Sequence, residues 1–303
     1  MSVRHLLDID DLDVDDLRKI VEFGLDPDKT AQPLAGQGVA CIFEKPSTRT
    51  RNSTEMAVRQ LGGHPIYITG EEIGIDTRES ASDITRTLAC YHRVICARVY
   101  DHHVLEKMAS VGELPIVNLL SDRAHPLQAI ADVMTIQAEL GSVEDKTVTY
   151  IGDTNNVAVS LALAVGMLGG RVRLASPSGY QIGEQDQERL VAAGAEPTTF
   201  TDTKKAASGS DVIYTDTWIS MGQEQEKERR LADLAAFQVD DAVMAECPDA
   251  IVMHCLPAHR GEEVSASVLD GPQSKIWVQA AYRQNAAVGV LSWLLEGATN
   301  GDR

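Results

Sequence analysis

A run of hydroxyl and cationic side chains at residues 47–51, Ser-Thr-Arg-Thr-Arg, could bind an oxyanion. It follows an apolar run at residues 38–43 that is typical of a buried strand, and the residues after it keep helical spacing as far as Gln60. Ser47 or Thr48 can cap this helix, whose first turn offers unpaired backbone N–H groups and the positive end of its dipole. We therefore expect a phosphate cradle here. The alternative is a helix cap followed by a solvated basic turn.

The sequence His-Pro-Leu-Gln at residues 125–128 could polarise a carbonyl group. It begins a predicted helix that ends at Gly141. The dipole at a helix N-terminus favours the neutral form of His125, which can then donate an N–H to a carbonyl oxygen without carrying charge. Gln128, one turn on, can accept a hydrogen bond from an NH2 group. Taken alone, the histidine could also be no more than a helix cap.

A carboxylate follows a later predicted strand, in residues 215–222, which read Thr-Asp-Thr-Trp-Ile-Ser-Met-Gly. Asp216, at the end of this strand, could pair with an ammonium group. Ser220 and Met221 precede a glycine on a segment that could close over a substrate. The alternative is a strand followed by a loop with a solvated aspartate.

Residues 253–257, Met-His-Cys-Leu-Pro, place a thiol at the end of another predicted strand. The bond between Leu256 and Pro257 is a candidate for the cis form, which a tight turn can favour. Adjacent strand residues point to opposite faces, so His254 and Cys255 are not expected to share a zinc ion. The other histidines considered also lack a ligand partner at metal spacing: His259, His102 and His103.

These motifs resemble those of the aspartate/ornithine carbamoyltransferase family, and the resemblance covers essentially the whole chain. In that family a Ser-Thr-Arg-Thr loop binds carbamoyl phosphate, and a His-Cys-Leu-Pro segment places a cysteine and a backbone carbonyl beside the reacting amine. Residues 216–222 resemble the Asp-x-x-x-Ser-Met-Gly loop of the ornithine carbamoyltransferases. The resemblance implies attack of the neutral δ-amine of L-ornithine on carbamoyl phosphate, which gives L-citrulline and phosphate, in arginine biosynthesis or arginine catabolism.

The resemblance also implies which residues of this chain form the site. Those expected to bind carbamoyl phosphate are Ser47, Thr48, Arg49, Thr50, Arg98, His125, Gln128, Cys255, Leu256 and Arg283. Those expected to bind ornithine are Asn156, Asp216, Ser220 and Met221. Catalytic roles are implied for Cys255, Arg98, His125 and Arg283. Positioning and electrostatic stabilisation suffice for this reaction, so we expect neither a metal nor an organic cofactor.

Three other functions fit parts of the sequence. A carbamoyltransferase for another amine, such as putrescine or an acylated ornithine, would keep the phosphate cradle, but Asp216 and the Ser-Met pair favour a free α-amino acid. A non-catalytic amino-acid or anion-binding protein would not need the cradle, the His-Pro-Leu-Gln sequence and Cys255 together. An oxidoreductase is disfavoured, because residues 150–156 follow a strand but lack the second and third glycines of the dinucleotide fingerprint.

One departure from the family concerns the neighbouring subunit. The family often contributes a glutamine from that subunit, in a loop before a Glu-Ser pair that here is Glu79-Ser80. Residues 71–78 contain no glutamine, so another residue of this loop is expected in its place. The family implies a homotrimer, or an assembly of trimers, with active sites near subunit boundaries.

Short apolar runs alternate with amphipathic helices along the chain, which predicts parallel strands joined by right-handed crossovers. We expect an α/β protein of two doubly wound parallel-sheet domains, formed by residues 1–136 with 287–303 and by residues 137–286. A long helix after His125 and a C-terminal crossover helix join them. The predicted strands lie at residues 38–43, 64–68, 94–100, 115–119, 147–151, 172–175, 212–215, 251–254 and 276–279.

The chain has 303 residues, a formal net charge of −18 and five cysteines. The negative charge argues against nucleic acid or an anionic membrane as a partner, because the long-range field would repel both. It also suggests a salt-adapted host; the alternative is an ordinary acidic protein. We see no apolar run long enough to span a membrane, no signal-peptide core and no CxxC spacing, so a cytoplasmic protein with reduced thiols is expected.

Overall fold

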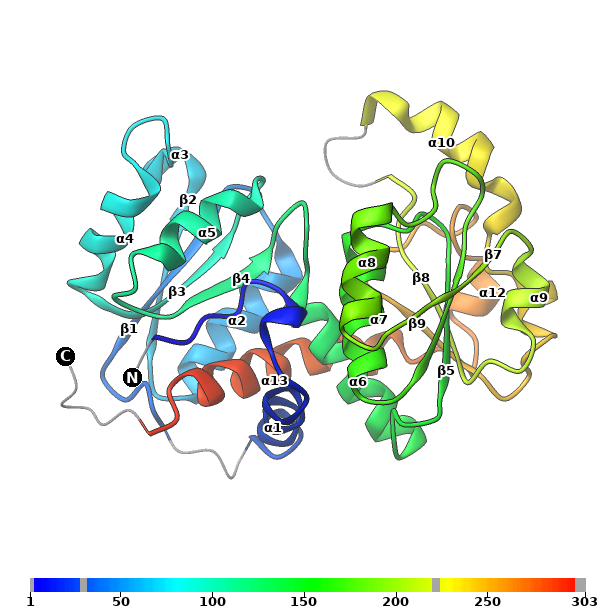
Figure 1. The fold of residues 1–303 in the computed structure, drawn as a ribbon, viewed down its shortest axis with the longest axis horizontal. Helices are drawn as coiled ribbons and strands as arrows, with labels where there is room; N and C mark the ends of the chain where they lie inside the picture. The colour runs from blue at the N-terminus through cyan, green and yellow to red at the C-terminus, as the bar shows by residue number, and fades with distance from the viewer. Residues whose placement is uncertain (1–2, 28–31, 220–223, 298–303) are drawn as a thin grey trace. The chain divides into compact units, whose positions relative to one another are not determined.

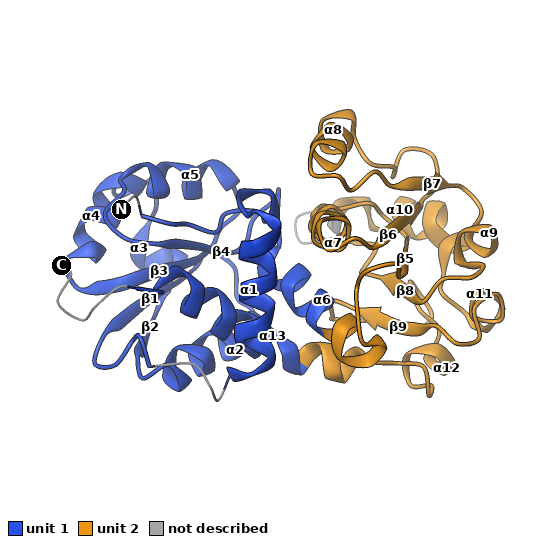
Figure 2. Cartoon of the chain, turned by 60° about the horizontal axis from the view of Figure 1, so that its bottom comes forward, with its two compact units in different colours: residues 1–134, 281–303 blue, residues 135–280 orange. Residues whose placement is uncertain are grey.

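The computed structural model describes residues 3–27, 32–219 and 224–297. The chain divides into two compact units, unit 1 (Met1–Met134 with Ala281–Arg303) and unit 2 (Thr135–Ala280) (Figure 2). Each boundary falls inside a helix, the first in α6 (Pro126–Leu140) and the second in α13 (Ile276–Leu294). Residues 281–286 therefore group with unit 1, whereas the sequence placed them in the second domain.

Unit 1 is built on a four-stranded sheet whose strands pair in parallel in the order β2-β1-β3-β4 (Figure 1). The strands are β1 (Gly38–Phe43), β2 (His64–Thr69), β3 (His92–Arg98) and β4 (Ile116–Leu120). After β1, strand β2 pairs with one edge of β1 and strand β3 pairs with the other edge, so the strand order reverses between β1 and β3. In parallel sheets ligands collect at such a reversal, beyond the carboxyl ends of the strands.

Helices cover both faces of this sheet. Ala40 and Ile42 of β1 share a buried cluster with side chains of α4 and α5, as the two-residue period of a strand requires for one face. Besides α6 and α13, the described part of unit 1 contains the helices η1 (Ile9–Asp11), α1 (Val14–Leu25), α2 (Thr48–Gln60), α3 (Gly70–Ile73), α4 (Ala81–Ala89) and α5 (His102–Ser110).

The C-terminal helix α13 packs against α1 at close range within unit 1. A Cβ atom built on Gly289 would lie 2.3 Å from the carbonyl oxygen of Ile20. On the facing helix, a Cβ on Gly24 would lie 2.8 Å from the carbonyl oxygen of Asn285. Asn285 also donates through Nδ2 to the carbonyl oxygen of Gly24, at 2.8 Å. The two glycines thus allow backbone-to-backbone packing of the first and last long helices.

Unit 2 is built on a five-stranded parallel sheet in the order β7-β6-β5-β8-β9. Its strands are β5 (Thr147–Ile151), β6 (Arg171–Ala175), β7 (Thr198–Phe200), β8 (Val212–Thr215) and β9 (Ile251–His254). Here the order reverses between β5 and β8, so the segments that follow these two strands meet at one edge.

One face of the second sheet is covered by short helices and the other by α7, which is buried on nearly all sides (Figure 1). A helix that is apolar all round belongs in the interior rather than at a surface. Outside the undescribed residues 220–223, the helices that lie wholly in unit 2 are α7 (Asn156–Met167), α8 (Glu184–Ala192), α9 (Thr203–Ala207), η3 (Glu224–Glu226), α10 (Lys227–Leu234), η4 (Ala235–Phe237), α11 (Asp241–Met244) and α12 (Ala266–Leu269).

The predicted fold class is confirmed, with two parallel sheets each flanked by helices, but one predicted strand is wrong. Residues 276–279 form the first turn of α13, because Ile276, Gln279 and Arg283 recur at helical spacing and are all buried. The fifth strand of unit 2 is instead β7, a short and largely exposed edge strand that sequence reasoning missed. Its Thr-Thr-Phe sequence is too short to show a period.

All five cysteines are free thiols, as predicted. Among the described residues, no helix combines the length and the hydropathy needed to cross a bilayer.

Candidate active site

The predicted phosphate cradle is the N-terminus of α2. Ser47 is the cap residue, with extended backbone, and its Oγ accepts the N–H of Thr50 at 3.2 Å. Of the two cap candidates from the sequence, Ser47 is therefore the one used. Thr50 lies buried in the first turn, whereas Thr48 is exposed and Arg49 half-buried. Helix dipole, backbone N–H groups and a guanidinium thus share one short segment.

The segment after β1 is tied to the segment after β3. The N–H of Glu44 donates to the carbonyl oxygen of Arg98 at 2.9 Å, and the N–H of Tyr100 donates to the carboxylate of Glu44 at 2.7 Å. The ammonium of Lys45 lies 4.0 Å from the ring centroid of Tyr100. Arg98 itself is the buried last residue of β3. The strand-order reversal therefore places Arg98 beside the loop that leads into the cradle.

A buried polar chain links three helices of unit 1. Arg283 of α13 donates through Nη2 to Thr50 Oγ1 of α2, at 3.2 Å, and through Nη1 to Gln128 Oε1 of α6. Gln128 in turn donates through Nε2 to Asp132 Oδ1, at 2.8 Å. Four polar side chains thus share an interior. Three of them were predicted site residues; Asp132 was not.

His125, which directly precedes α6, is 2% exposed and surrounded by positive charge. Burial lowers the pKa of His125 well below its ordinary value, and the guanidinium groups of Arg283, Arg98 and Arg49 lower it further. These causes favour the neutral imidazole, and they are burial and neighbouring charge rather than the helix dipole on which the sequence-based expectation rests. The environment of His125 also brings those three arginines together in one part of unit 1.

The turn before His125 is held by side chains that the sequence did not single out. The N–H of Ala124 donates to Ser121 Oγ at 3.2 Å, and Asn118 Nδ2 donates to the same oxygen at 3.2 Å. Ser121 Oγ lies 2.8 Å from Nδ1 of the buried His102. Burial lowers the pKa of His102, so its Nδ1 can accept the hydroxyl hydrogen of Ser121. This network fixes the backbone that presents His125.

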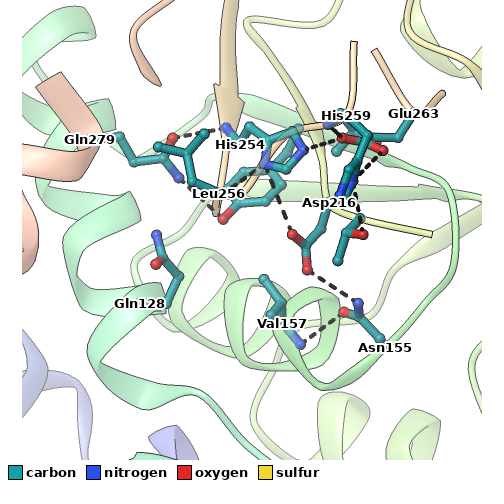
Figure 3. A network of polar contacts seen from close by, with 12 residues as sticks. Gln128, Asn155, Val157, Asp216, His254, Leu256, His259, Glu263 and Gln279 are labelled. Atoms are coloured by element: carbon teal, nitrogen blue, oxygen red, sulfur yellow. Dashed lines mark hydrogen bonds and ion pairs between the residues drawn. The ribbon is translucent and has the colours of Figure 1, made fainter. Parts of the chain in front are cut away.

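In unit 2, Asp216 follows β8 and faces the N-terminus of α7, which follows β5 (Figure 3). Asn155 caps α7, and its Oδ1 accepts the N–H groups of Val157, at 3.0 Å, and Ala158, at 3.2 Å. This sets the amide so that Nδ2 donates to Asp216 Oδ2, at 3.3 Å. Burial raises the pKa of Asp216 above its ordinary value, against the opposing effects of His254 and of hydrogen bonds from the backbone of Thr217 and from Asn155.

The segment that follows β9 is organised by His254 (Figure 3). The N–H of Leu256 donates to His254 Nδ1 at 2.8 Å, so Nε2 carries the hydrogen and donates to Glu263 Oε1 at 3.1 Å. Burial acts to raise the pKa of Glu263, but hydrogen bonds from His254 and from the backbone of His259 outweigh it and lower the pKa. The Leu256–Pro257 bond is cis, as predicted, and Leu256 has a positive φ of 62°.

His259 has neighbours that sequence spacing did not reveal. One ligand atom each of His259, Glu262 and Glu263 lies within 4.8 Å of the other two. The expectation that His259 lacks a ligand partner at metal spacing was therefore wrong. The turn after Pro257 brings His259 close to Glu262 and Glu263. Glu263 is already engaged by His254 and by the backbone of His259.

Arg230 of α10 anchors the segment that follows Asp216. It pairs with Asp153, and its Nε donates to the carbonyl oxygen of Trp218 at 2.6 Å. Its guanidinium also lies 5.0 Å from the ring centroid of Tyr180. Because Arg230 is itself buried, this contact fixes the backbone at Trp218. Two predicted ligands farther along, Ser220 and Met221, lie outside the described residues.

The predicted residues thus form one group in each unit. In unit 1, Thr50, Gln128 and Arg283 are joined by hydrogen bonds, and His125 has Arg49, Arg98 and Arg283 around it. In unit 2, Asp216 lies beside the start of α7, where Asn156 is the first residue, and the half-buried Cys255 directly follows β9. Sequence reasoning missed the polar residues that support these groups: Asn118, Ser121, Asp132, Asn155, Arg230, Glu263 and Gln279.

Two domain families match the chain, and their bounds follow the two units except at residues 281–294, which group with unit 1 but match the second family. Residues 4–138 match the aspartate/ornithine carbamoyltransferase carbamoyl-P binding domain, and residues 144–294 match the Asp/Orn binding domain of the same enzymes. A relative named ornithine carbamoyltransferase from Haloquadratum walsbyi is 41% identical over 96% of this chain and 97% of its own. One from Pyrococcus abyssi is 44% identical over 88% of this chain and 86% of its own.

Solved structures agree with the sequence relatives. The ornithine carbamoyltransferase of Pyrococcus furiosus superposes with a TM-score of 0.92 at 40% identity, over 98% of this chain and 99% of its own. An N-acetyl-L-ornithine transcarbamylase superposes with a TM-score of 0.86 over 96% of this chain and 100% of its own, at 23% identity. The second likeness shows the fold alone, so the fold does not discriminate between acceptor amines.

Proposed function

The chain belongs to the aspartate/ornithine carbamoyltransferase family, and from that membership we propose how its residues carry out the reaction. It is an ornithine carbamoyltransferase that converts carbamoyl phosphate and L-ornithine to L-citrulline and phosphate, a step of arginine metabolism. The observation that carries the proposed mechanism is the group in unit 1 where neutral His125 is surrounded by arginines and Arg283 links Thr50 to Gln128.

Carbamoyl phosphate binds to unit 1. The backbone N–H groups and hydroxyls at the start of α2 hold the phosphate together with Arg49, because a helix N-terminus and a guanidinium both favour an anion. Thr50, Arg98 and the neutral His125 donate to the carbamoyl oxygen, whose negative charge grows in the transition state. Gln128 accepts from the NH2 group, and Arg283 stabilises the tetrahedral intermediate. The residues that hold the phosphate are Ser47, Thr48, Arg49 and Thr50.

L-Ornithine binds to unit 2 through its amino-acid end. The carboxylate of Asp216 pairs with the α-ammonium group, and Asn155 orients that carboxylate through the 3.3 Å hydrogen bond. Asn156, at the first turn of α7, and the Ser220-Met221 pair contact the same end of the substrate.

The neutral δ-amine then attacks the carbamoyl carbon while Cys255 and Leu256 contact the reacting groups. A C–N bond forms, the C–O bond to phosphate breaks, and the departing phosphate takes the amine proton. His254 fixes the Leu256 backbone for this step through the 2.8 Å hydrogen bond. Positioning and electrostatic stabilisation supply the rate enhancement, so the mechanism needs no cofactor.

The first experiment measures ureido product from carbamoyl phosphate with ornithine, putrescine, N-acetylornithine and aspartate in parallel. We expect citrulline from ornithine and no product from the other three, because Asp216 requires a free α-ammonium group. Product from another amine would contradict the ornithine half of the assignment and leave the carbamoyl phosphate half standing.

The Arg49→Ala variant distinguishes a carbamoyltransferase from a non-catalytic amino-acid-binding protein. We expect turnover to fall at least about a hundredfold, since a charge-assisted contact to phosphate is lost, while ornithine binding is kept. Full turnover in this variant would contradict the proposed cradle.

The larger context of the enzyme is also a proposal. We propose a cytoplasmic homotrimer or assembly of trimers, with residues 71–78, which run from the end of α3 into the segment before α4, near a neighbouring subunit. The family resemblance supports the assembly, and the free thiols support the compartment. The acidic surface supports a salt-adapted host. Light scattering coupled to gel filtration should give a mass that is a multiple of three chains, and a monomer would contradict the proposed assembly.

A further inference from the structure

Glu263 carries a buried carboxylate oxygen that the proposed mechanism does not use (Figure 3). Its Oε1 accepts from His254 and from the backbone N–H of His259, whereas its Oε2 is buried and makes no hydrogen bond with any residue that the structure describes. Burial acts to raise the pKa of Glu263, but the hydrogen bonds at Oε1 hold that pKa below its ordinary value, so the carboxyl is ionised at neutral pH. A buried anionic oxygen without a hydrogen bond is costly, and a bound cation would compensate for it.

Two further side chains with metal-binding atoms lie near this oxygen. His259 Nδ1 is 3.5 Å from Glu263 Oε2, and one ligand atom each of His259, Glu262 and Glu263 lies within 4.8 Å of the other two. The backbone sets this spacing, because the N–H of Glu262 donates to the carbonyl oxygen of His259 at 2.9 Å and closes a turn. Arg260, the cation within this turn, pairs with Asp270 at 2.7 and 2.9 Å. The turn thus gathers an imidazole and two carboxyl groups.

The imidazole of His259 does not by itself satisfy Glu263 Oε2. An N–H donor usually lies about 2.7–3.2 Å from an oxygen acceptor, and the 3.5 Å separation is longer. The ligand atoms around one tetrahedral metal ion, with bonds of about 2.1 Å, lie about 3.4 Å apart. The separation of these two atoms therefore fits a shared metal ion better than a hydrogen bond. Glu262 is half-buried, so rotation of its side chain can bring the third ligand atom to the same ion.

We propose that His259, Glu262 and Glu263 bind one divalent transition-metal ion such as Zn²⁺ or Co²⁺. One imidazole nitrogen and two carboxylate oxygens suit these ions, whereas Ca²⁺ and Mg²⁺ prefer oxygen ligands alone. The ion takes no part in the proposed carbamoyl transfer. It stabilises the turn at residues 259–263, which Glu263 joins to the end of β9 through His254.

The test titrates ZnCl2 by calorimetry into protein that has been treated with EDTA and desalted, without substrate. Wild type should bind one ion per chain, and its melting temperature should rise with Zn²⁺ concentration, because the ion binds the folded site. His259→Asn and Glu262→Gln should each raise the dissociation constant at least about tenfold. His103→Asn is the matched control, since it also removes an exposed histidine close to a glutamate, here 2.6 Å from Glu106, and should leave the dissociation constant unchanged.

Co²⁺ distinguishes this site from the free thiols, because a thiolate is a competing metal ligand and Cys90 and Cys255 are exposed and half-buried. Co²⁺ held by nitrogen and oxygen atoms gives weak visible absorption, whereas a thiolate ligand adds a strong charge-transfer band in the near ultraviolet. We expect the weak bands alone. A strong charge-transfer band at one Co²⁺ per chain would place the ion at a cysteine and overturn the inference.

The wild-type titration is a test even if a variant does not fold. Absence of saturable Zn²⁺ binding by wild type would overturn the inference, and so would equal dissociation constants for wild type and for either folded variant. Circular dichroism of the metal-free variants shows whether each is folded, and the two variants give independent comparisons. Failure of wild type to make citrulline would contradict the proposed function and leave this inference standing, because Zn²⁺ binding is measured without substrate.

Discussion

Burial shifts the pKa values of single side chains of this protein, toward the protonation state that the chemistry needs at His125 and away from it at Asp216. His125 is buried and faces three guanidinium groups, which lower its pKa well below the ordinary value, so the neutral imidazole can donate to a carbonyl oxygen at neutral pH. At Asp216 burial raises the pKa and favours the uncharged acid, whereas binding of an ammonium group requires the carboxylate. Its hydrogen bonds from Asn155 and its neighbour His254 partly restore the carboxylate that an ammonium ligand requires.

The raised pKa of Asp216 predicts how binding of the amino-acid end depends on pH. L-Norvaline, which is ornithine without its δ-amine, should inhibit less well as the pH falls through this pKa, because the protonated acid no longer attracts the α-ammonium group. The loss should begin at a higher pH than for an exposed aspartate. The measurement is the inhibition constant of L-norvaline across the acidic range.

Asp216→Asn is the control for that experiment. Without the charge, L-norvaline should bind about tenfold to a hundredfold more weakly, and its affinity should no longer change with pH in the acidic range. An asparagine variant with the wild-type pH profile would show that another group titrates.

The reacting amine predicts a second pH dependence. Only the neutral δ-amine attacks, and an amine like that of lysine has a pKa near about 10.4, so kcat/KM for ornithine should rise about tenfold per pH unit through the neutral range. Neutral His125 adds no inflection there, since its pKa is far below this range. A flat profile would contradict control by amine deprotonation.

At the scale of elements, the two strand-order reversals decide which segments meet. In the proposed mechanism, the segments after β1 and β3 bind the phosphate, and those after β5 and β8 bind the amino-acid end of ornithine. Hydrogen bonds such as Glu44 to Arg98 in unit 1 and Asn155 to Asp216 in unit 2 then lock adjacent segments together. We therefore expect substitutions of the supporting residues in these turns to affect activity as well.

Ser121→Ala tests the turn that presents His125. The substitution removes the acceptor for the Ala124 N–H and the partner of His102, so we expect a loss of about 1–3 kcal/mol in unfolding free energy and a roughly tenfold or greater fall in kcat. Denaturant unfolding and steady-state kinetics provide the two readouts. Ser110→Ala, at an exposed helix end, should change neither, and an unaffected kcat in Ser121→Ala would argue against a positioning role.

Gly289→Ala tests the packing of α1 on α13. The added methyl would meet the Ile20 carbonyl, a backbone atom that cannot rotate away, so we expect destabilisation by about 1–3 kcal/mol. Thermal unfolding measures it. Gly183→Ala is the matched control, because a Cβ there meets nothing within 4 Å, and it should leave the melting temperature nearly unchanged. Equal effects of the two substitutions would contradict backbone-to-backbone packing.

For the whole molecule, net charge sets the response to salt. A formal charge of −18 on 303 residues implies self-repulsion that dissolved ions screen. The melting temperature and the activity should therefore rise from dilute buffer to molar KCl. Sucrose of equal osmolality is the control, because it is not ionic and should not reproduce the rise in activity. Equal stability and activity in dilute buffer and molar KCl would contradict salt adaptation.

The sequence by itself determined the two parallel sheets, the free thiols, the helix that begins at the cradle and the family. These properties follow from local patterns, because apolar runs, caps and turn residues act over a few neighbouring positions. The cap at Ser47 and the cis bond at Leu256 are examples. The same local reasoning failed at residues 276–279, where a β-branched apolar run begins a helix whose buried positions continue as far as Leu294.

Only the tertiary structure decided which distant side chains share an interior. Arg283 joins Gln128 and Thr50, which are 155 and 233 positions away in the chain, and no spacing rule connects such residues. The same holds for His102 with Ser121 and for His254 with Glu263. Burial and neighbouring charge, which set the pKa values of His125 and Asp216, arise only when these segments pack together.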